Sequence, residues 1–211
     1  MSHYRLPSGR HGLPREVVTE SQRARLTAAM IAVVAEHGYE GATMNEIVGA
    51  AGVSKRTFYG YFASKEECFF NTFDAIARHL ETAMRAAGAE DDEWPERVKL
   101  RIGAMLEAFA ANPDLARFVL IVPAAGRGEV AERYRELLAS LLAILVDDAP
   151  DDVARRPSPG AEESLMGAVA ALIGRSVRAG EGEKLADLKP VLTELVLTPY
   201  LGRRAAQKTI S

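Results

Sequence analysis

The stretch of sequence that decides the fold runs from Thr43 to Glu67 and reads TMNEIVGAAGVSKRTFYGYFASKEE. Thr43 and Glu46 match the T-x-x-E pattern of a capping box, in which each side chain satisfies a free backbone N–H at the start of a helix. This helix is short, because Gly52 interrupts it and a second short helix follows. Two short helices joined by a turn that contains glycine have the spacing of a helix-turn-helix, which we predict over residues 43–62.

The side chains of this stretch divide into an inward apolar set and an outward polar set. The apolar residues are expected to hold both helices against a first helix, predicted over residues 21–37; they are Ile47, Val53, Phe58 and Phe62. A helix that enters the DNA major groove needs donors near its N-terminal end for base edges and flanking groups for phosphates. The outward candidates on or just after the second helix are Lys55, Arg56, Thr57, Tyr59 and Tyr61.

The sequence on either side predicts helices and almost no strands. In the first helix the apolar residues Leu26, Met30 and Val34 recur every four positions, which is the period of one buried helical face. Gly38 follows directly and is the residue type best suited to a left-handed C-terminal cap. This part of the chain is therefore expected to be helical up to the motif.

Ser64 and Glu67 repeat the capping-box pattern and predict the start of a long fourth helix that ends near residue 88. Further helices are predicted over residues 95–111, 112–123, 129–147, 161–179 and 185–201, so the expected fold class is all-α.

Composition places the chain among ordinary globular proteins, with 48% hydrophobic and 26% charged residues in 211. A single cysteine, Cys68, excludes an internal disulfide, and no run approaches the ~18 apolar residues of a membrane helix. We therefore expect a soluble, cytoplasmic protein with no membrane partner. Charge says little about DNA, since residues 1–70 carry eight Lys and Arg against seven Glu and the whole chain has a net charge of −3.

Residues 23–80 resemble the tetracycline-repressor (TetR) family of bacterial transcriptional regulators. The resemblance is carried by a helix ending in Gly-Tyr, then Thr43, then Ala-Gly-Val-Ser-Lys-x-Thr-x-Tyr-x-Tyr-Phe-x-Ser-Lys-Glu from Ala51 to Glu66. It implies a flexible N-terminal arm over residues 1–20, a three-helix helix-turn-helix head over 21–66, and a helical effector-binding and dimerisation domain over 67–211. It further implies a homodimer that binds a palindromic double-stranded DNA operator, more often as a repressor, and that a small effector releases.

The resemblance also assigns roles to individual residues. Thr43 matches a contact to phosphate or base at the start of the second helix, and Lys65 matches a phosphate-contacting lysine. The base-reading positions are Lys55, Arg56 and Thr57, and the backbone-contacting aromatics are Tyr59 and Tyr61. The alternative for the two tyrosines is simple packing, and for Lys65 it is a solvated position. Gly60 departs from the family pattern and either shortens the recognition helix or allows a closer approach to DNA.

The effector and the partner subunit are less clearly marked. Apolar side chains on different C-terminal helices are expected either to line a cavity for a small apolar or aromatic effector or to pack in an ordinary core; they are Phe73, Trp94, Met105, Phe109, Phe118 and Met166. A dimer interface is predicted on the last two helices, through Leu165, Val169, Leu172 and Ile173 with intervening small residues, and through Val191, Leu192, Leu195 and Val196. The N-terminal arm carries Arg5, Arg10 and Arg15 and is either a minor-groove contact or a disordered tail.

Two other classes of protein compete with this interpretation. Residues 118–131 followed by Asp147 and Asp148 imitate the strand, G-x-G-x-x-A turn and distant acid of a dinucleotide site, but Pro123 interrupts the pattern and no other strand is predicted. A helical ligand-binding protein without sequence-specific DNA contact is the second alternative. The four histidines lack metal-ligand spacing and Cys68 fits a core position, so we predict no enzyme activity, metal or cofactor.

Overall fold

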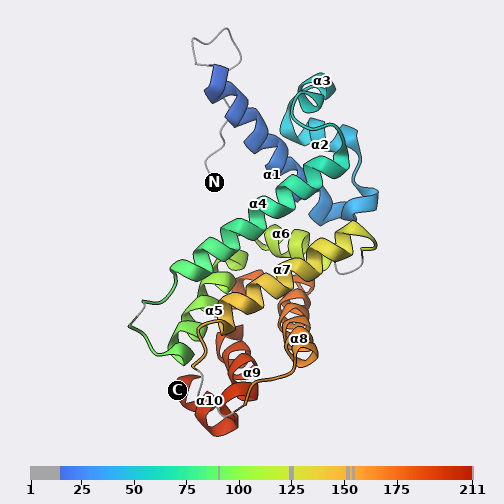
Figure 1. Cartoon of the computed structure of the whole chain (residues 1–211). Coiled ribbons are helices and arrows are strands. Elements are labelled where there is room, and N and C mark those ends of the chain that lie inside the picture. The colour runs from blue at the N-terminus through green and yellow to red at the C-terminus, as the bar shows by residue number, and fades with distance from the viewer. Residues whose placement is uncertain (1–14, 90, 124–125, 151–152, 154, 211) are drawn as a thin grey trace. The chain divides into compact units, whose positions relative to one another are not determined.

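The computed structural model describes residues 15–89, 91–123, 126–150, 153 and 155–210, and these form helices joined by turns (Figure 1). Within those ranges there is no strand. The chain divides into two compact units, Met1–Thr72 and Phe73–Ser211. The predicted all-α fold class is confirmed, and the alternative of a dinucleotide-binding sheet is contradicted, because Arg117–Ile121 lies in a helix.

The first unit begins with a long helix, α1 (Arg15–Gly41), which extends beyond the predicted range at both ends. Gly38 interrupts it with a backbone φ of 73°, so the chain turns where a left-handed glycine was expected. Residues 15–20, predicted as part of a flexible arm, belong to this helix. The rest of the arm, with Arg5 and Arg10, lies outside the described residues.

Two short helices follow, α2 (Met44–Ala51) and α3 (Lys55–Tyr59). They pack against α1 through side chains that are fully buried, among them Leu26, Ile47 and Phe58. Fully burying an aliphatic or aromatic side chain contributes about 1.5–3 kcal/mol, so this small apolar cluster is the main force that holds α2 and α3 in place.

The helix α4 (Lys65–Ala86) contributes its first turns to the N-terminal unit and the remainder to the C-terminal unit. Only one of the two hydrogen bonds of the capping box predicted at the start of α4 is formed. Ser64 Oγ accepts from Glu67 N–H, as predicted, but the Glu67 carboxylate accepts from Ala63 N–H instead of from Ser64.

The C-terminal unit consists of short and long helices that pack around α5. In chain order they are α5 (Trp94–Ala111), α6 (Pro113–Ala116), the π-helical turn η1 (Arg117–Ile121), α7 (Glu129–Val146), α8 (Pro159–Arg178), the 3₁₀ segment η3 (Gly182–Leu188), α9 (Lys189–Leu201) and α10 (Arg203–Ile210). The final helix was not predicted, because Gly202 breaks the chain with a φ of 75° and the eight residues after it carry few apolar side chains.

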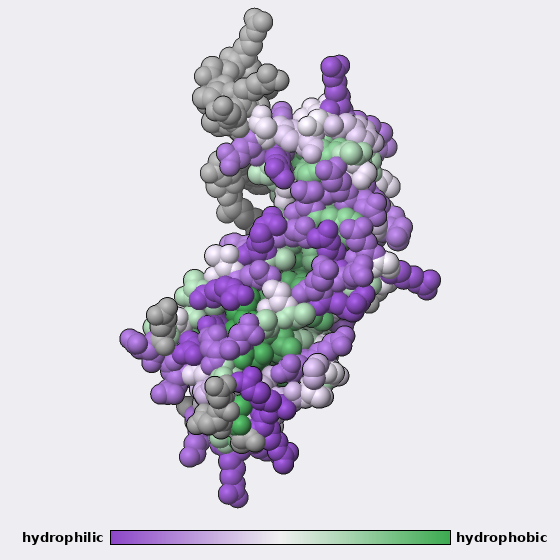
Figure 2. Space-filling model, in the orientation of Figure 1, coloured by the Kyte–Doolittle hydropathy of each residue, from purple (hydrophilic) through white to green (hydrophobic). Residues whose placement is uncertain are grey.

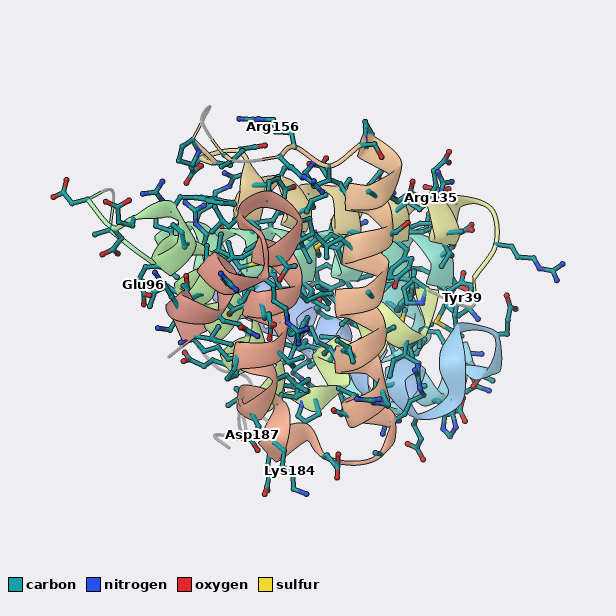
Figure 3. The ribbon with its side chains drawn as sticks, turned by 90° about the horizontal axis from the view of Figure 1, so that it is seen from below. Tyr39, Glu96, Arg135, Arg156, Lys184 and Asp187 are labelled. Carbon is teal, nitrogen blue, oxygen red and sulfur yellow. The ribbon has the colours of Figure 1, made fainter. Side chains whose placement is uncertain are left out.

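Trp94 anchors one end of this unit. Its indole N–H donates to the carbonyl oxygen of Leu145 at 2.9 Å, and its ring meets Tyr200 edge-on at a centroid distance of 5.5 Å. α5 is thereby joined to the end of α7 and to α9. Figure 3 shows the side chains of this unit filling the space between its helices, and Figure 2 shows hydrophobic residues reaching the surface between polar ones. No helix among the described residues is long and apolar enough to cross a membrane.

Candidate DNA-binding surface and effector cleft

The N-terminus of α2 carries the predicted capping box in full. Thr43 is the N-cap, and its Oγ1 accepts from Glu46 N–H at 3.3 Å. The Glu46 carboxylate accepts from Thr43 N–H at 2.8 Å and from the Thr43 hydroxyl at 2.7 Å. These hydrogen bonds, followed by the nearby His37 ring, lower the pKa of Glu46. The Thr43 hydroxyl proton is therefore used inside the head and must exchange partners before it can reach a phosphate.

The turn after α2 is built on Gly52, which has left-handed backbone angles of φ 60° and ψ 41°. Its N–H donates to Gly49 O, and the next N–H, from Val53, donates to Val48 O. Glycine adopts this conformation without the steric cost that a Cβ imposes. The chain is thereby reversed within two residues, and α3 begins at once.

At the start of α3, Ser54 is the N-cap and its Oγ accepts from Thr57 N–H at 3.0 Å. The hydroxyls of Ser54 and Thr57 are also hydrogen-bonded to each other at 2.9 Å. Thr57 was predicted as a base-reading residue. With its hydroxyl engaged locally, its methyl group is the part that remains for contact with a base.

Three of the predicted residues on α3 are exposed: Lys55, Arg56 and Tyr59, the last with 57% of its surface accessible. No side-chain hydrogen bond or ion pair of these three residues is found among the described residues, although the Tyr59 ring meets Phe58 edge-on. Gly60 caps the end of α3 with an ordinary φ of −76°, so the helix stops there without a backbone that requires glycine.

Tyr61 and Lys65 have partners inside the head that the sequence did not reveal. The Tyr61 hydroxyl donates to Gln22 Oε1 at 2.9 Å. Lys65 Nζ donates to the carbonyl oxygens of Tyr39 at 2.8 Å and Ala42 at 3.0 Å, and lies 4.4 Å from the centre of the Tyr39 ring. Both side chains therefore fasten later segments to α1, and two of the three ammonium protons of Lys65 are already used.

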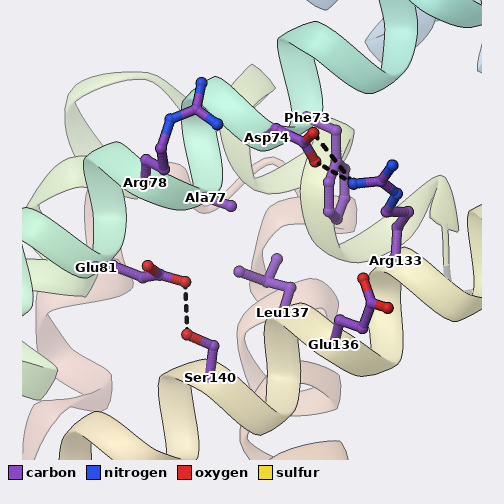
Figure 4. A pocket seen from close by; sticks show the side chains of 9 residues that line it. All are labelled: Phe73, Asp74, Ala77, Arg78, Glu81, Arg133, Glu136, Leu137 and Ser140. Carbon is purple, nitrogen blue, oxygen red and sulfur yellow. Dashed lines mark hydrogen bonds and ion pairs between the residues drawn. The ribbon is translucent and has the colours of Figure 1, made fainter.

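A cleft of about 240 Å³ lies in the C-terminal unit between α4 and α7 (Figure 4). Its floor is apolar and its rim is charged; the lining residues are Phe73, Asp74, Ala77, Arg78, Glu81, Arg133, Glu136, Leu137 and Ser140. Two polar links cross it. Arg133 Nη1 donates to both carboxylate oxygens of Asp74, each at 3.1 Å, and Ser140 Oγ donates to Glu81 Oε1 at 2.5 Å.

The six residues predicted to line an effector cavity are all buried, with at most 2% of any of them exposed; they are Phe73, Trp94, Met105, Phe109, Phe118 and Met166. Phe73 lines the cleft between α4 and α7, and the other five do not. The sequence missed the charged rim, because nothing local marks residues of α4 and α7 as neighbours.

The predicted dimer face needs a correction. Leu165, Val169 and Ile173 on α8 are buried in the chain's own core, with exposures of 7% or less, as are Leu192 and Val196 on α9. The opposite side of α8 is exposed and carries the small residues Gly167, Ala168 and Ala171, while Val191 on α9 is 46% exposed. The apolar spacing marked the inner face of these helices, which packs in the chain's own core.

Several known proteins resemble this chain in sequence or in fold. Residues 26–72 match the family described as bacterial regulatory proteins, tetR family. An HTH-type transcriptional repressor of Streptomyces coelicolor is 27% identical over 100 residues, which cover 47% of this chain and 48%, about half, of that protein. The HTH-type transcriptional regulator BetI of Rhizobium meliloti is 29% identical over 165 residues, covering 74% of this chain and 79% of the relative.

Among solved structures, the transcriptional regulator FadR of Bacillus subtilis in complex with stearoyl-CoA matches with a TM-score of 0.69. The sequence identity is 19%, and the match covers 83% of this chain and 98% of that one. This likeness extends the shared fold into the C-terminal unit, whereas the family match rests on the head. The helix-turn-helix, its capping box and these matches lead to one conclusion: residues 26–72 form a helix-turn-helix head of the kind found in the tetR family of bacterial regulatory proteins.

Proposed function

We propose that this chain is a DNA-binding transcriptional repressor that leaves its operator when a small apolar effector binds. TetR-family proteins are DNA-binding regulators and not enzymes, in agreement with the predicted absence of catalysis. The observation that carries the proposal is that three exposed side chains on the capped helix α3, those of Lys55, Arg56 and Tyr59, have no hydrogen-bond or ion-pair partner among the described residues.

Each member of the trio has a distinct task in the proposed complex. Arg56 reads guanine, since its guanidinium donates two hydrogen bonds to O6 and N7 in the major groove. Lys55 supplies a second cation at the start of the same helix, and the Tyr59 hydroxyl contacts a phosphate. The Thr57 methyl group contacts a thymine methyl group. Specificity thus resides in the first turns of α3.

Three residues outside α3 support the proposed contact with DNA; they are Thr43, Tyr61 and Lys65. Thr43 contacts the phosphate backbone once its hydroxyl exchanges the Glu46 carboxylate for a phosphate oxygen. Tyr61 holds its segment to α1 through its hydroxyl, and Lys65 keeps one ammonium proton for a phosphate while the other two bind carbonyls.

The effector site is assigned to the cleft between α4 and α7. Its floor of Phe73, Ala77 and Leu137 suits an apolar chain or ring, and Arg78 and Arg133 on the rim suit an anionic group. The volume of about 240 Å³ is below the ~300–1,000 Å³ of typical ligand pockets. A typical effector therefore has to widen the cleft, which separates α4 from α7. The FadR structure with stearoyl-CoA makes an acyl thioester the first molecule to test.

Widening the cleft provides the route to DNA release. Effector binding breaks the links from α7 to Asp74 and Glu81 and allows α4 to move, and α4 also supplies Lys65 to the head. The effector shifts the equilibrium only by the difference between its affinities for the released and the DNA-bound states.

The proposed assembly is a homodimer. A second copy would cover the exposed side of α8, where Gly167, Ala168 and Ala171 permit close helix approach, together with Val191 of α9. A two-fold dimer implies a palindromic operator with half-sites spaced to match its two recognition helices. A regulator of this kind works where the chromosome lies, in the cytoplasm.

The test begins with selection of binding sites from a random pool of double-stranded DNA by the purified chain. We expect enrichment of a palindromic sequence, salt-sensitive binding to it, and loss of binding on addition of stearoyl-CoA. Equal affinity for all sequences would favour instead a helical ligand-binding protein without specific DNA contact. Selected DNA that stays bound with stearoyl-CoA, free stearate and a panel of aromatic compounds would reject the effector assignment alone.

A further inference from the structure

A cation on the first helix lies against the turn that separates the two helices of the motif. Arg25 extends from α1, and its Nη2 donates to the carbonyl oxygens of Ala51 and of Gly52, the latter at 2.8 Å. Ala51 is the last residue of α2, and Gly52 is its left-handed cap. The guanidinium thus lies where the unpaired carbonyls and the negative end of the helix dipole meet.

The position of the Arg25 guanidinium also depends on the absence of a side chain at Gly52. A Cβ on Gly52 would stand 2.6 Å from Arg25 Nη2, so the guanidinium would have to move from its present position. Glycine at this position therefore does more than allow a left-handed backbone, because it leaves the space in which the guanidinium reaches two carbonyls. The Arg25 side chain is half-buried, so its hydrogen bonds to the two carbonyls are partly shielded from solvent.

We infer that Arg25 is a positioning residue for DNA reading: it fixes the turn, and through the turn the direction of α3, without touching DNA. α3 begins three residues after Gly52 and consists of five residues. Such a short helix cannot define its own orientation, and its apolar anchor, Phe58, holds it at a single point near its end. The hydrogen bonds from Arg25 to the carbonyl oxygens of Ala51 and Gly52 hold the segment before α3 at a second point. This inference rests on the proposed function, since it concerns how that function reads DNA.

A matched control lies two residues away on the same helix. Arg23 carries the same charge and is exposed, but it lies near Asn71, at 3.5 Å, and over the Phe62 ring. Arg23→Met removes an identical cation from the head and leaves both turn carbonyls with Arg25. Arg25→Lys keeps the charge but offers a single ammonium in place of the planar fork, so it retains part of the contact.

The experiment has two readouts on the full-length chain. The first is affinity for the DNA selected by the wild type and for an unrelated duplex, measured over a range of salt concentrations. Arg25→Met is expected to lose about tenfold in affinity for the selected DNA and little for the unrelated duplex, with an unchanged salt slope. Arg25→Lys should lie between the two, and Arg23→Met close to the wild type. A fall of about 0.9 in the salt slope would show that Arg25 contacts a phosphate, and would overturn the inference.

The second readout requires no DNA. The N–H groups of Gly52 and Val53 form the hydrogen bonds of the turn, and their hydrogen exchange should accelerate about tenfold in Arg25→Met relative to core amides of α1. Unchanged exchange of these two amides in both Arg25 variants would reject the inference. If the wild type selects no sequence, the proposed function fails and the positioning role falls with it. If it selects one that all variants bind equally, the positioning role alone fails.

Discussion

Arg133 on α7 donates from Nη1 to both carboxylate oxygens of Asp74 on α4, and this ion pair crosses the cleft (Figure 4). Both side chains are about one-third exposed, at 36% and 34%. The pair therefore resembles a surface ion pair, for which contributions of about 0–1 kcal/mol are usual. Its importance lies in its position, since it must break when the cleft widens.

Asp74→Asn is expected to lower the free energy of unfolding by less than about 1 kcal/mol and to make stearoyl-CoA release the selected DNA at up to about fivefold lower concentration. The reason is that the closed cleft loses a link that the open cleft does not have. The measurement is a DNA-binding titration with added stearoyl-CoA. Glu96→Gln, which removes a carboxylate from an ion pair on α5, is the control and should leave that concentration unchanged. A higher concentration in Asp74→Asn would contradict the prediction.

Arg56→Ala is expected to reduce affinity for the selected DNA by about 1–3 kcal/mol, or roughly five- to 150-fold, and to relax the preference at one base pair of each half-site. The exposed guanidinium has no partner among the described residues, so folding stability should change little. Repeating the site selection with the variant measures both effects. Arg204→Ala, which removes an exposed arginine of α10, should behave as the wild type. Uniform weakening on all sequences would assign Arg56 to the phosphate backbone.

Glu46 should make the stability of the head depend on pH. Hydrogen bonds from Thr43 lower the pKa of this carboxyl group from its ordinary value of 4.5, so the folded state favours the ionised form. The resulting stability is fully present above about pH 4.5 and is lost as pH falls through the lower, folded-state pKa.

Denaturant unfolding of the wild type and of Glu46→Gln between about pH 7 and pH 3 tests this. The wild type should be the more stable at neutral pH, and the difference should shrink below about pH 4.5. Glu163→Gln, on the exposed side of α8, serves as the control. A difference that stays constant over the whole range would show that the carboxylate charge has no part in the capping box.

Cys68 is expected to resist thiol reagents in the folded protein. It is fully buried, and burial raises the pKa of its thiol from 9.0 to about 12. A rise of this size lowers the thiolate fraction at neutral pH roughly a thousandfold, and the thiolate is the reactive form. Colorimetric titration should find almost no reaction in buffer and one equivalent in denaturant, since the chain has one cysteine. Rapid reaction of the folded protein would show that α4 opens at this point.

Local sequence was sufficient for the elements whose interactions span a few residues. The capping box joins residues 43 and 46, and the turn at Gly52 depends on the conformational freedom of glycine, so both could be predicted from neighbouring letters. The exposed positions of Lys55, Arg56 and Tyr59 followed from the alternation of apolar and polar residues on one short helix. The helix termini were predicted less accurately. α1 ends at Gly41 and α10 begins directly after Gly202, and the residues near these glycines are only weakly apolar.

By itself, the sequence determined the all-α fold class, the helix-turn-helix and the likeness of its head to the tetR family, because these depend on periodicity, caps and a dense local pattern. Only the tertiary structure decided which polar side chains are available for binding. Lys65 and its carbonyl partner Tyr39 are 26 residues apart, Tyr61 and Gln22 are 39 apart, and Asp74 and Arg133 are 59 apart. No local spacing encodes such pairs. They arise when apolar burial brings distant helices together, and the same burial turned the apolar face of α8 inward and left Gly167, Ala168 and Ala171 exposed.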